Sequence, residues 1–92
     1  MAETNSFLVM KALAQLAKNK GGKRKMSSNI EIKNLLNEKG RLISSNDIDS
    51  ALDVLIQVRY CRYRINTYKQ KEYQWYGLTK MGWNKLYELL RK

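Results

Sequence analysis

The chain has 92 residues, enough for one hydrophobic core and too few for two, so we expect a single domain over residues 1–92. A hydrophobic content of 43% excludes wholesale disorder, and no apolar run approaches the roughly 20 residues of a membrane span. Eighteen Lys and Arg against eight Asp and Glu give a net charge of +10, which favours a polyanionic partner.

The residue types that most often carry catalysis are scarce. There is no histidine, the commonest metal ligand and general base, and the carboxylates are scattered along the chain. The single cysteine, Cys61, excludes an internal disulfide and fits a reducing compartment. The N-terminus also lacks the pattern of a signal peptide, which predicts a cytoplasmic protein. We therefore expect no enzyme, cofactor, metal or small-molecule substrate.

The first predicted helix begins near residue 7. Apolar residues recur at three- and four-residue spacing over residues 7–17, and residues 4–6 offer side chains that can cap its start. Gly21 and Gly22 follow and favour an end near Asn19.

A strongly basic loop is predicted over residues 18–26. It carries five cations and no acid, and its two glycines would let it follow a nucleic-acid backbone. The alternative is a solvated loop without a partner. The residues predicted to bind phosphates here are Lys18, Lys20, Lys23, Arg24 and Lys25.

Two helices joined by a short turn are predicted over residues 28–58. Ser28 and Glu31 have the spacing of a capping box, and Gly40 ends the first of the two helices. A third helix of the chain begins at residues 44–46, where serine and asparagine can cap it. Two helices around a short glycine-containing turn form a helix-turn-helix.

The outward side of this third helix holds side chains that can reach base edges. Asp47, Asp49 and Asp53 lie there too and would repel phosphates. Asp47 and Asp49 suit the positive end of the helix dipole, whereas Asp53 is too far along the helix for that role. The residues predicted to read bases are Ser45, Asn46, Ser50 and Gln57.

After residue 58 the apolar period changes from 3.6 to 2, which predicts a β-hairpin over residues 59–78. Alternation puts Tyr76 and Leu78 in the core and Tyr73 and Trp75 on the outer face. Aromatic rings exposed there could stack on bases, enter a minor groove or be buried in a dimer, whereas a register shifted by one would return Trp75 to the core. The hairpin residues predicted to bind phosphates are Arg62, Arg64, Lys69 and Lys71.

The last predicted helix covers residues 79–91, with Thr79 as its cap. Its apolar residues span more than half of its circumference, which is more than one buried face needs. This predicts a homodimer formed through the helix, the alternative being a monomer whose last helix lies in a groove of its own domain. The predicted interface residues are Met81, Trp83, Leu86, Leu89 and Leu90.

The order helix, helix, helix, strand, strand, helix, closed by YGLTKMGWNKLYELL, resembles the winged helix-turn-helix domain of small archaeal and bacterial transcription regulators of the PadR and MarR type. The resemblance runs from about residue 7 to residue 90. A short motif, aromatic–Leu-Thr–x-x-Gly, matches Tyr76, Leu78, Thr79 and Gly82. The composition, rich in Lys, Ile and Tyr and without His or Pro, also resembles that of proteins from thermophilic archaea and their viruses.

The resemblance implies an α+β winged helix-turn-helix: a three-helix core, a two-stranded β-hairpin wing and a C-terminal helix. It implies a regulator of transcription that binds double-stranded DNA, with the helix at about residues 46–58 in the major groove and the wing along the backbone. Two rival functions stay open. One is a winged-helix protein-interaction module that uses the acidic helix, and the other is an RNA or single-strand binder that stacks bases on the wing aromatics.

Overall fold

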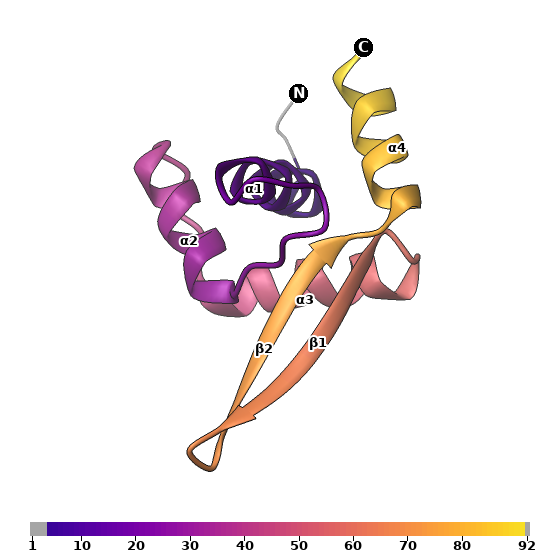
Figure 1. The fold of residues 1–92 in the computed structure, drawn as a ribbon. Helices are drawn as coiled ribbons and strands as arrows, with labels where there is room; N and C mark the ends of the chain where they lie inside the picture. Colours follow the sequence, from indigo (N-terminus) through magenta and orange to yellow (C-terminus); the bar gives the residue numbers. More distant parts are fainter. Residues whose placement is uncertain (1–3, 92) are drawn as a thin grey trace.

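The computed structural model describes residues 4–91, which form four α-helices and one antiparallel pair of strands (Figure 1). The order of elements and the α+β class are as predicted. The elements are α1 (Asn5–Asn19), α2 (Asn29–Glu38), α3 (Ser45–Gln57), β1 (Cys61–Tyr68), β2 (Lys71–Leu78) and α4 (Lys80–Leu90).

Each of these helices starts at a hydroxyl side chain that accepts a hydrogen bond from a backbone N–H of the first turn. At the start of α2 the Glu31 carboxylate also accepts from the Ser28 N–H, which completes the predicted capping box. Gly40 takes the left-handed conformation after α2, with φ of 78°. The capping residues are Thr4, Ser28, Ser44 and Thr79.

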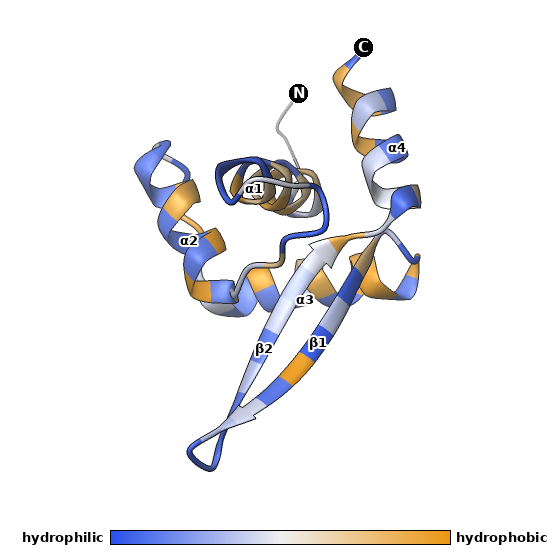
Figure 2. Cartoon of the chain, viewed as in Figure 1, coloured by the Kyte–Doolittle hydropathy of each residue, from blue (hydrophilic) through white to orange (hydrophobic). Residues whose placement is uncertain are grey.

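The core forms around α1, which contacts α2, α3, α4 and β2. Buried apolar side chains from all six elements form one cluster, so the described residues share a single core. Figure 2 shows hydrophilic residues along the loop between α1 and α2 and at the tip of the hairpin. The largest fully buried apolar side chains are Val9, Ile32, Ile48, Leu52 and Leu86.

The hairpin has the register that the alternation predicted. Cys61 pairs with Leu78 and Tyr68 with Lys71, and both residues of the intervening turn have positive φ. Tyr76 and Leu78 are buried on the side of the core. Tyr73, 44% exposed, and the half-buried Trp75 lie on the opposite face, so Trp75 is not returned to the core.

The root of the hairpin is joined to α4 by a close backbone contact. A Cβ atom on Gly82 would lie 1.9 Å from the Tyr60 carbonyl oxygen, so only glycine fits. The Thr79 hydroxyl donates to the Arg59 carbonyl at 2.6 Å, and the Thr79 N–H donates to that of Tyr60 at 3.1 Å. The predicted role of Thr79 as a cap is therefore confirmed, and Gly82 is the site where the two backbone segments approach closely.

Candidate nucleic-acid interface

The outward side of α3 exposes all four predicted base-reading residues, Ser45, Asn46, Ser50 and Gln57. The helix has no Lys or Arg of its own. Asp49 accepts a hydrogen bond from the Asn29 side chain at 2.6 Å, and the same amide donates to the Ser45 carbonyl at 3.2 Å. Asp49 thus links α3 to the start of α2, a role that the sequence pattern did not indicate.

Asp53 lines a hollow of about 370 Å³ between α3 and the inner face of the hairpin. Desolvation by burial raises the pKa of the Tyr76 phenol there, and the negative charges of Asp49 and Asp53 raise it further. Asp53 is the one charged side chain lining this hollow, so the space between α3 and the wing is weakly acidic. The lining residues are Asp53, Ile56, Gln57, Tyr63, Ile65, Gln74 and Tyr76.

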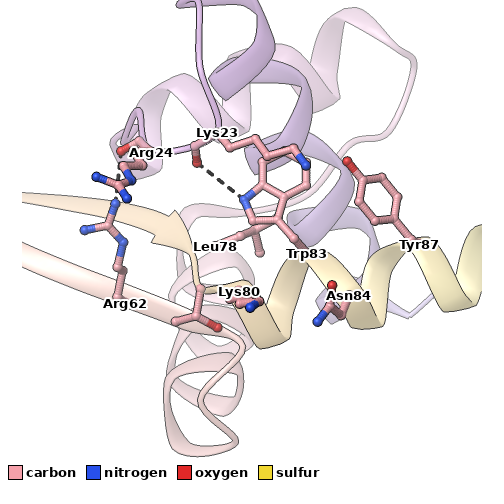
Figure 3. Close-up of a pocket in the computed structure, with 9 residues that line it drawn as sticks. Lys23, Arg24, Arg62, Leu78, Lys80, Trp83, Asn84 and Tyr87 are labelled. Atoms are coloured by element: carbon pink, nitrogen blue, oxygen red, sulfur yellow. Dashed lines mark hydrogen bonds between the residues drawn. The ribbon is translucent and has the colours of Figure 1, made fainter.

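The basic loop between α1 and α2 is anchored to the rest of the domain. The Trp83 indole N–H donates to the Lys23 carbonyl at 3.3 Å, and the Arg62 guanidinium donates to the Arg24 carbonyl at 3.0 Å (Figure 3). Ser27 exchanges two backbone hydrogen bonds with Tyr76, of 2.8 and 2.7 Å, and so forms an isolated antiparallel bridge at the root of the hairpin. The loop therefore has a defined position although it lacks regular structure.

Two lysines of this loop also interact with the domain through their side chains. The Lys20 ammonium forms an ion pair of 2.7 Å with Glu31 and donates to Ser27 Oγ and the Met26 carbonyl. The Lys23 ammonium lies 5.4 Å from the centre of the Trp83 ring and 5.3 Å from that of the Tyr87 ring. Lys20 is thus occupied within its own chain.

The outer face of the hairpin meets this loop. A hollow of about 480 Å³ has Arg62, Arg64, Asn66 and Trp75 on its hairpin side and residues 24–26 on its loop side. Basic residues from segments more than 35 positions apart in sequence thus form one surface. The wing-tip residues Lys69 and Lys71 are exposed at the far end of the hairpin.

A second hollow, of about 610 Å³, adjoins the first and shares Arg24 and Arg62 with it (Figure 3). It brings in Lys80, which the sequence analysis did not single out because nothing local distinguishes it from other surface lysines. We call the two hollows together the basic channel. The second hollow is lined by Lys23, Arg24, Arg62, Leu78, Thr79, Lys80, Trp83, Asn84 and Tyr87.

The structure divides the predicted dimer residues of α4 into two sets. Trp83 and Leu86 are buried in the core of this chain. Met81 and Leu90 are each 54% exposed, and Leu89 is half-buried. The apolar surface that α4 offers to a second copy therefore comes from Met81, Leu89 and Leu90, not from all five.

The thiol of Cys61 is buried. Cys61 lies in the core, and desolvation raises the pKa of its thiol to about 11 despite hydrogen bonds from the backbone of Gly77 and Arg62. Within residues 4–91, no group of three His, Cys, Asp or Glu is placed to hold a metal ion. No helix in that range is long and apolar enough to cross a membrane.

No protein-family model matches the sequence, and no curated protein is significantly similar to it. Solved structures do match. PadR of Bacillus subtilis in complex with operator DNA aligns with a TM-score of 0.79 at 19% identity, over 98% of this chain and 48% of that one. This chain therefore spans about half the length of that protein.

Two further PadR-family regulators match over more of their own length. The one from Clostridium difficile R20291 has a TM-score of 0.77 at 14% identity and covers 97% of this chain and 85% of its own. The one from Eggerthella lenta DSM 2243 has a TM-score of 0.76 at 19% identity, and the alignment covers 96% of this chain and 72% of that protein. The chain thus has the winged-helix fold seen in PadR-family transcription regulators.

Proposed function

We propose that this winged-helix chain is a transcription regulator that binds double-stranded DNA as a homodimer. The observation that carries the proposal is the position of α3, which exposes four hydrogen-bonding side chains in a domain with a large basic surface. A protein of the same fold, PadR of Bacillus subtilis, is seen with its operator DNA, which supports the same class of partner here.

Base readout is assigned to α3. Most of its exposed side chains are polar, and the helix can enter the major groove of B-DNA. Asn46 can form two hydrogen bonds to an adenine through the oxygen and nitrogen of its amide. Gln57 can do the same further along the helix. Ser45 and Ser50 supply single hydrogen bonds.

Phosphate binding is assigned to the exposed cations of the loop and the wing. Lys20 contributes less than predicted, because its ammonium is paired with Glu31. The wing tip, with Lys69 and Lys71, reaches the backbone beside the groove that α3 occupies. Lys18 is a further proposed phosphate ligand. Five more cations line the basic surface on the hairpin face opposite α3 and are proposed to bind DNA phosphates there: Lys23, Arg24, Lys25, Arg62 and Arg64.

The homodimer is assigned to the exposed apolar part of α4, formed by Met81, Leu89 and Leu90. A two-fold dimer would place two α3 helices for half-sites about one helical turn apart. The proposal requires no metal, cofactor or small-molecule substrate, and it involves no catalysis.

The test is fluorescence anisotropy of a mixed-sequence 30-base-pair duplex and of a matched single strand, titrated with protein across a salt series. We expect preference for the duplex and steep weakening with salt, because each neutralised phosphate releases counterions. Preference for the single strand would favour base stacking on the wing aromatics instead. Absence of binding to either at low salt would refute the proposed function and point to a protein partner for α3.

Base readout by α3 has a separate test on a selected target site. Asn46→Ala with Gln57→Ala should reduce the preference for that site over random DNA by about 1–3 kcal/mol per lost base contact. The salt dependence should stay as in the wild type, since neither side chain is charged. Unchanged sequence preference would show that α3 does not read bases.

A further inference from the structure

The two faces of the hairpin carry charge of opposite sign. Strand alternation and the observed pairing put Arg62, Arg64 and Lys71 on the outer face, which holds no acid. The inner face, turned toward α3, holds Glu72 and no cation. The three aspartates of α3 add to the acidic side. The basic channel and α3 therefore lie on opposite sides of the same sheet.

The basic channel carries no acidic side chain. Its two hollows share Arg24 and Arg62, and together they are lined by six cations and no carboxylate. Among the described residues, the ion pairs are Lys20 with Glu31 and Lys85 with Glu88, and neither involves a residue of the channel. The six cations are Lys23, Arg24, Lys25, Arg62, Arg64 and Lys80.

These cations lie in series rather than converging on one point. Lys80 lines the end toward α4, Arg24 and Arg62 lie in the middle, and Lys25 and Arg64 line the end along the hairpin. A single small anion would be held by groups aimed at one spot, whereas spaced charges with an open hollow suit a chain of phosphates. Asn66 and Asn84 add neutral donors along the same path.

A duplex read by α3 would have to bend to fill this channel as well. DNA has a persistence length of roughly 150 base pairs, so a bound segment is stiff on the scale of a domain 45 Å long. Reaching both faces of the hairpin root would require the duplex to turn sharply around the sheet. A second segment can reach the channel without the energetic cost of that bend.

We propose that the basic channel binds the sugar–phosphate backbone of a second DNA segment, so that each chain can bridge two duplexes. This inference rests on the proposed function, because α3 must hold the first duplex. The channel is a phosphate site without base readout, and any sequence can occupy it. Bridging then requires only that a second segment be near, as it is on the same long DNA molecule.

The test uses variants that reverse charge in the channel without disturbing its anchors. Arg24→Glu with Arg64→Glu changes two exposed side chains and leaves the Arg62 guanidinium, which holds the loop. The matched control is Lys39→Glu with Arg91→Glu, the same change of charge at exposed positions that do not line the channel. Thermal unfolding of all three proteins verifies that each is folded.

The measurement is retention of a fluorescent 30-base-pair duplex on an immobilised duplex by the full chain, beside anisotropy with one duplex alone. The wild type and the control should retain the fluorescent duplex. The channel variant should retain at most about a tenth as much of the fluorescent duplex, while α3 and the wing tip, which are unchanged, still bind a single duplex.

Four outcomes would overturn the inference. Equal retention by the channel variant would mean that two α3 helices of a dimer do the bridging. Complete loss of single-duplex binding by that variant would make the channel the primary DNA site. Retention of a fluorescent single strand but not of a duplex would assign the channel to a different polymer. Binding of one duplex by the wild type without any bridging would also refute it. Failure of the wild type to bind DNA at all would instead refute the proposed function.

Discussion

At the junction between the hairpin and α4, the size of one side chain decides whether the start of α4 can pack against the backbone that precedes β1. The hydrogen atom of Gly82 faces the Tyr60 carbonyl, while Thr79 both caps α4 and bonds the Arg59 carbonyl. These contacts join the end of β2 to the beginning of β1. The Leu-Thr–x-x-Gly motif is thus a local solution to a packing problem, in which the threonine sets the helix start and the glycine lets another backbone segment approach.

Replacing Gly82 by Ala should be strongly destabilising. The new Cβ would overlap a backbone oxygen, which cannot move as a flexible side chain can, so we expect a loss of about 3 kcal/mol in the free energy of unfolding. Urea denaturation measures it. Gly22→Ala is the matched control, since nothing lies within 4 Å of its added Cβ. Equal stability of the two variants would contradict the close contact.

The Cys61 thiol should be unreactive in the folded protein. Burial raises its pKa from 9.0 to about 11, so at pH 8 the thiolate is about 100-fold less populated than in the unfolded chain. Reaction with dithiobis-nitrobenzoate should therefore be slow in buffer and fast in denaturant. Because the folded state keeps the proton, stability should fall as the pH rises from about 9 toward 11, and Cys61→Ala should remove that part of the dependence. Fast reaction in buffer would contradict the burial.

At the scale of elements, the loop between α1 and α2 has no regular structure and is fixed in position by contacts with the rest of the domain. Carbonyls of Lys23 and Arg24 accept hydrogen bonds from α4 and β1, and Ser27 pairs with β2. At the start of the loop, Lys20 reaches forward to Glu31 of α2. The loop is basic enough to be repelled by its own charge, and these contacts hold its cations beside those of the wing.

The stability contributed by the Lys20–Glu31 ion pair should depend on pH. Burial by itself would raise the pKa of the Glu31 carboxyl, but hydrogen bonds from Lys20 and Ser28 and the charge of Lys20 outweigh it, so the pKa is lowered from 4.5. A lowered folded pKa means that the stabilisation is present above pH 4.5 and is lost as the pH falls through the folded value.

Glu31→Gln should therefore lower the unfolding midpoint at pH 7, and the difference from the wild type should shrink as the pH falls below about 4.5. Thermal unfolding followed by circular dichroism across pH 3–7 measures it. Glu38→Gln, near the exposed end of the same helix, is the control and should show little effect at either pH. A constant difference across this range would show that the carboxylate charge is not what matters.

At the scale of the whole molecule, the net charge of +10 hides a separation of charge. The loop, the outer wing face and the start of α4 form a basic side, and α3 with the inner wing face forms an acidic one. On the proposed function, DNA would meet both sides, with bases read by the α3 surface and phosphates bound by the basic surface. The salt dependence of binding should come mostly from the second surface.

The proposed dimer belongs to this scale as well. Leu90→Glu places a charge on the exposed apolar part of α4, away from the core, and should convert a dimer to a monomer with little loss of monomer stability. Sedimentation velocity measures the oligomeric state. Leu86→Glu serves as the contrast, because a charge in the core should unfold the chain rather than separate two copies. A wild type that sediments as a monomer would refute the dimer.

Much of the architecture could be predicted from the sequence, because the signals that mark it are local. Caps at Ser28 and Thr79, the change of period after residue 58 and the alternation through Tyr76 and Leu78 involve neighbours a few residues apart. The hairpin register followed for the same reason, since a slip by one residue would have exposed Leu78.

Only the tertiary structure decided how distant segments meet. No local pattern indicates that Asp49 bonds Asn29, that Lys20 pairs with Glu31, or that Trp83 turns inward to hold the basic loop. Hydrophobic residues around most of α4 looked alike in sequence, and packing against α1 and the loop separated the buried ones from those left exposed. Charge and periodicity are properties of a segment, but a surface is made of several segments. Packing of the core therefore determines which charged side chains share a face.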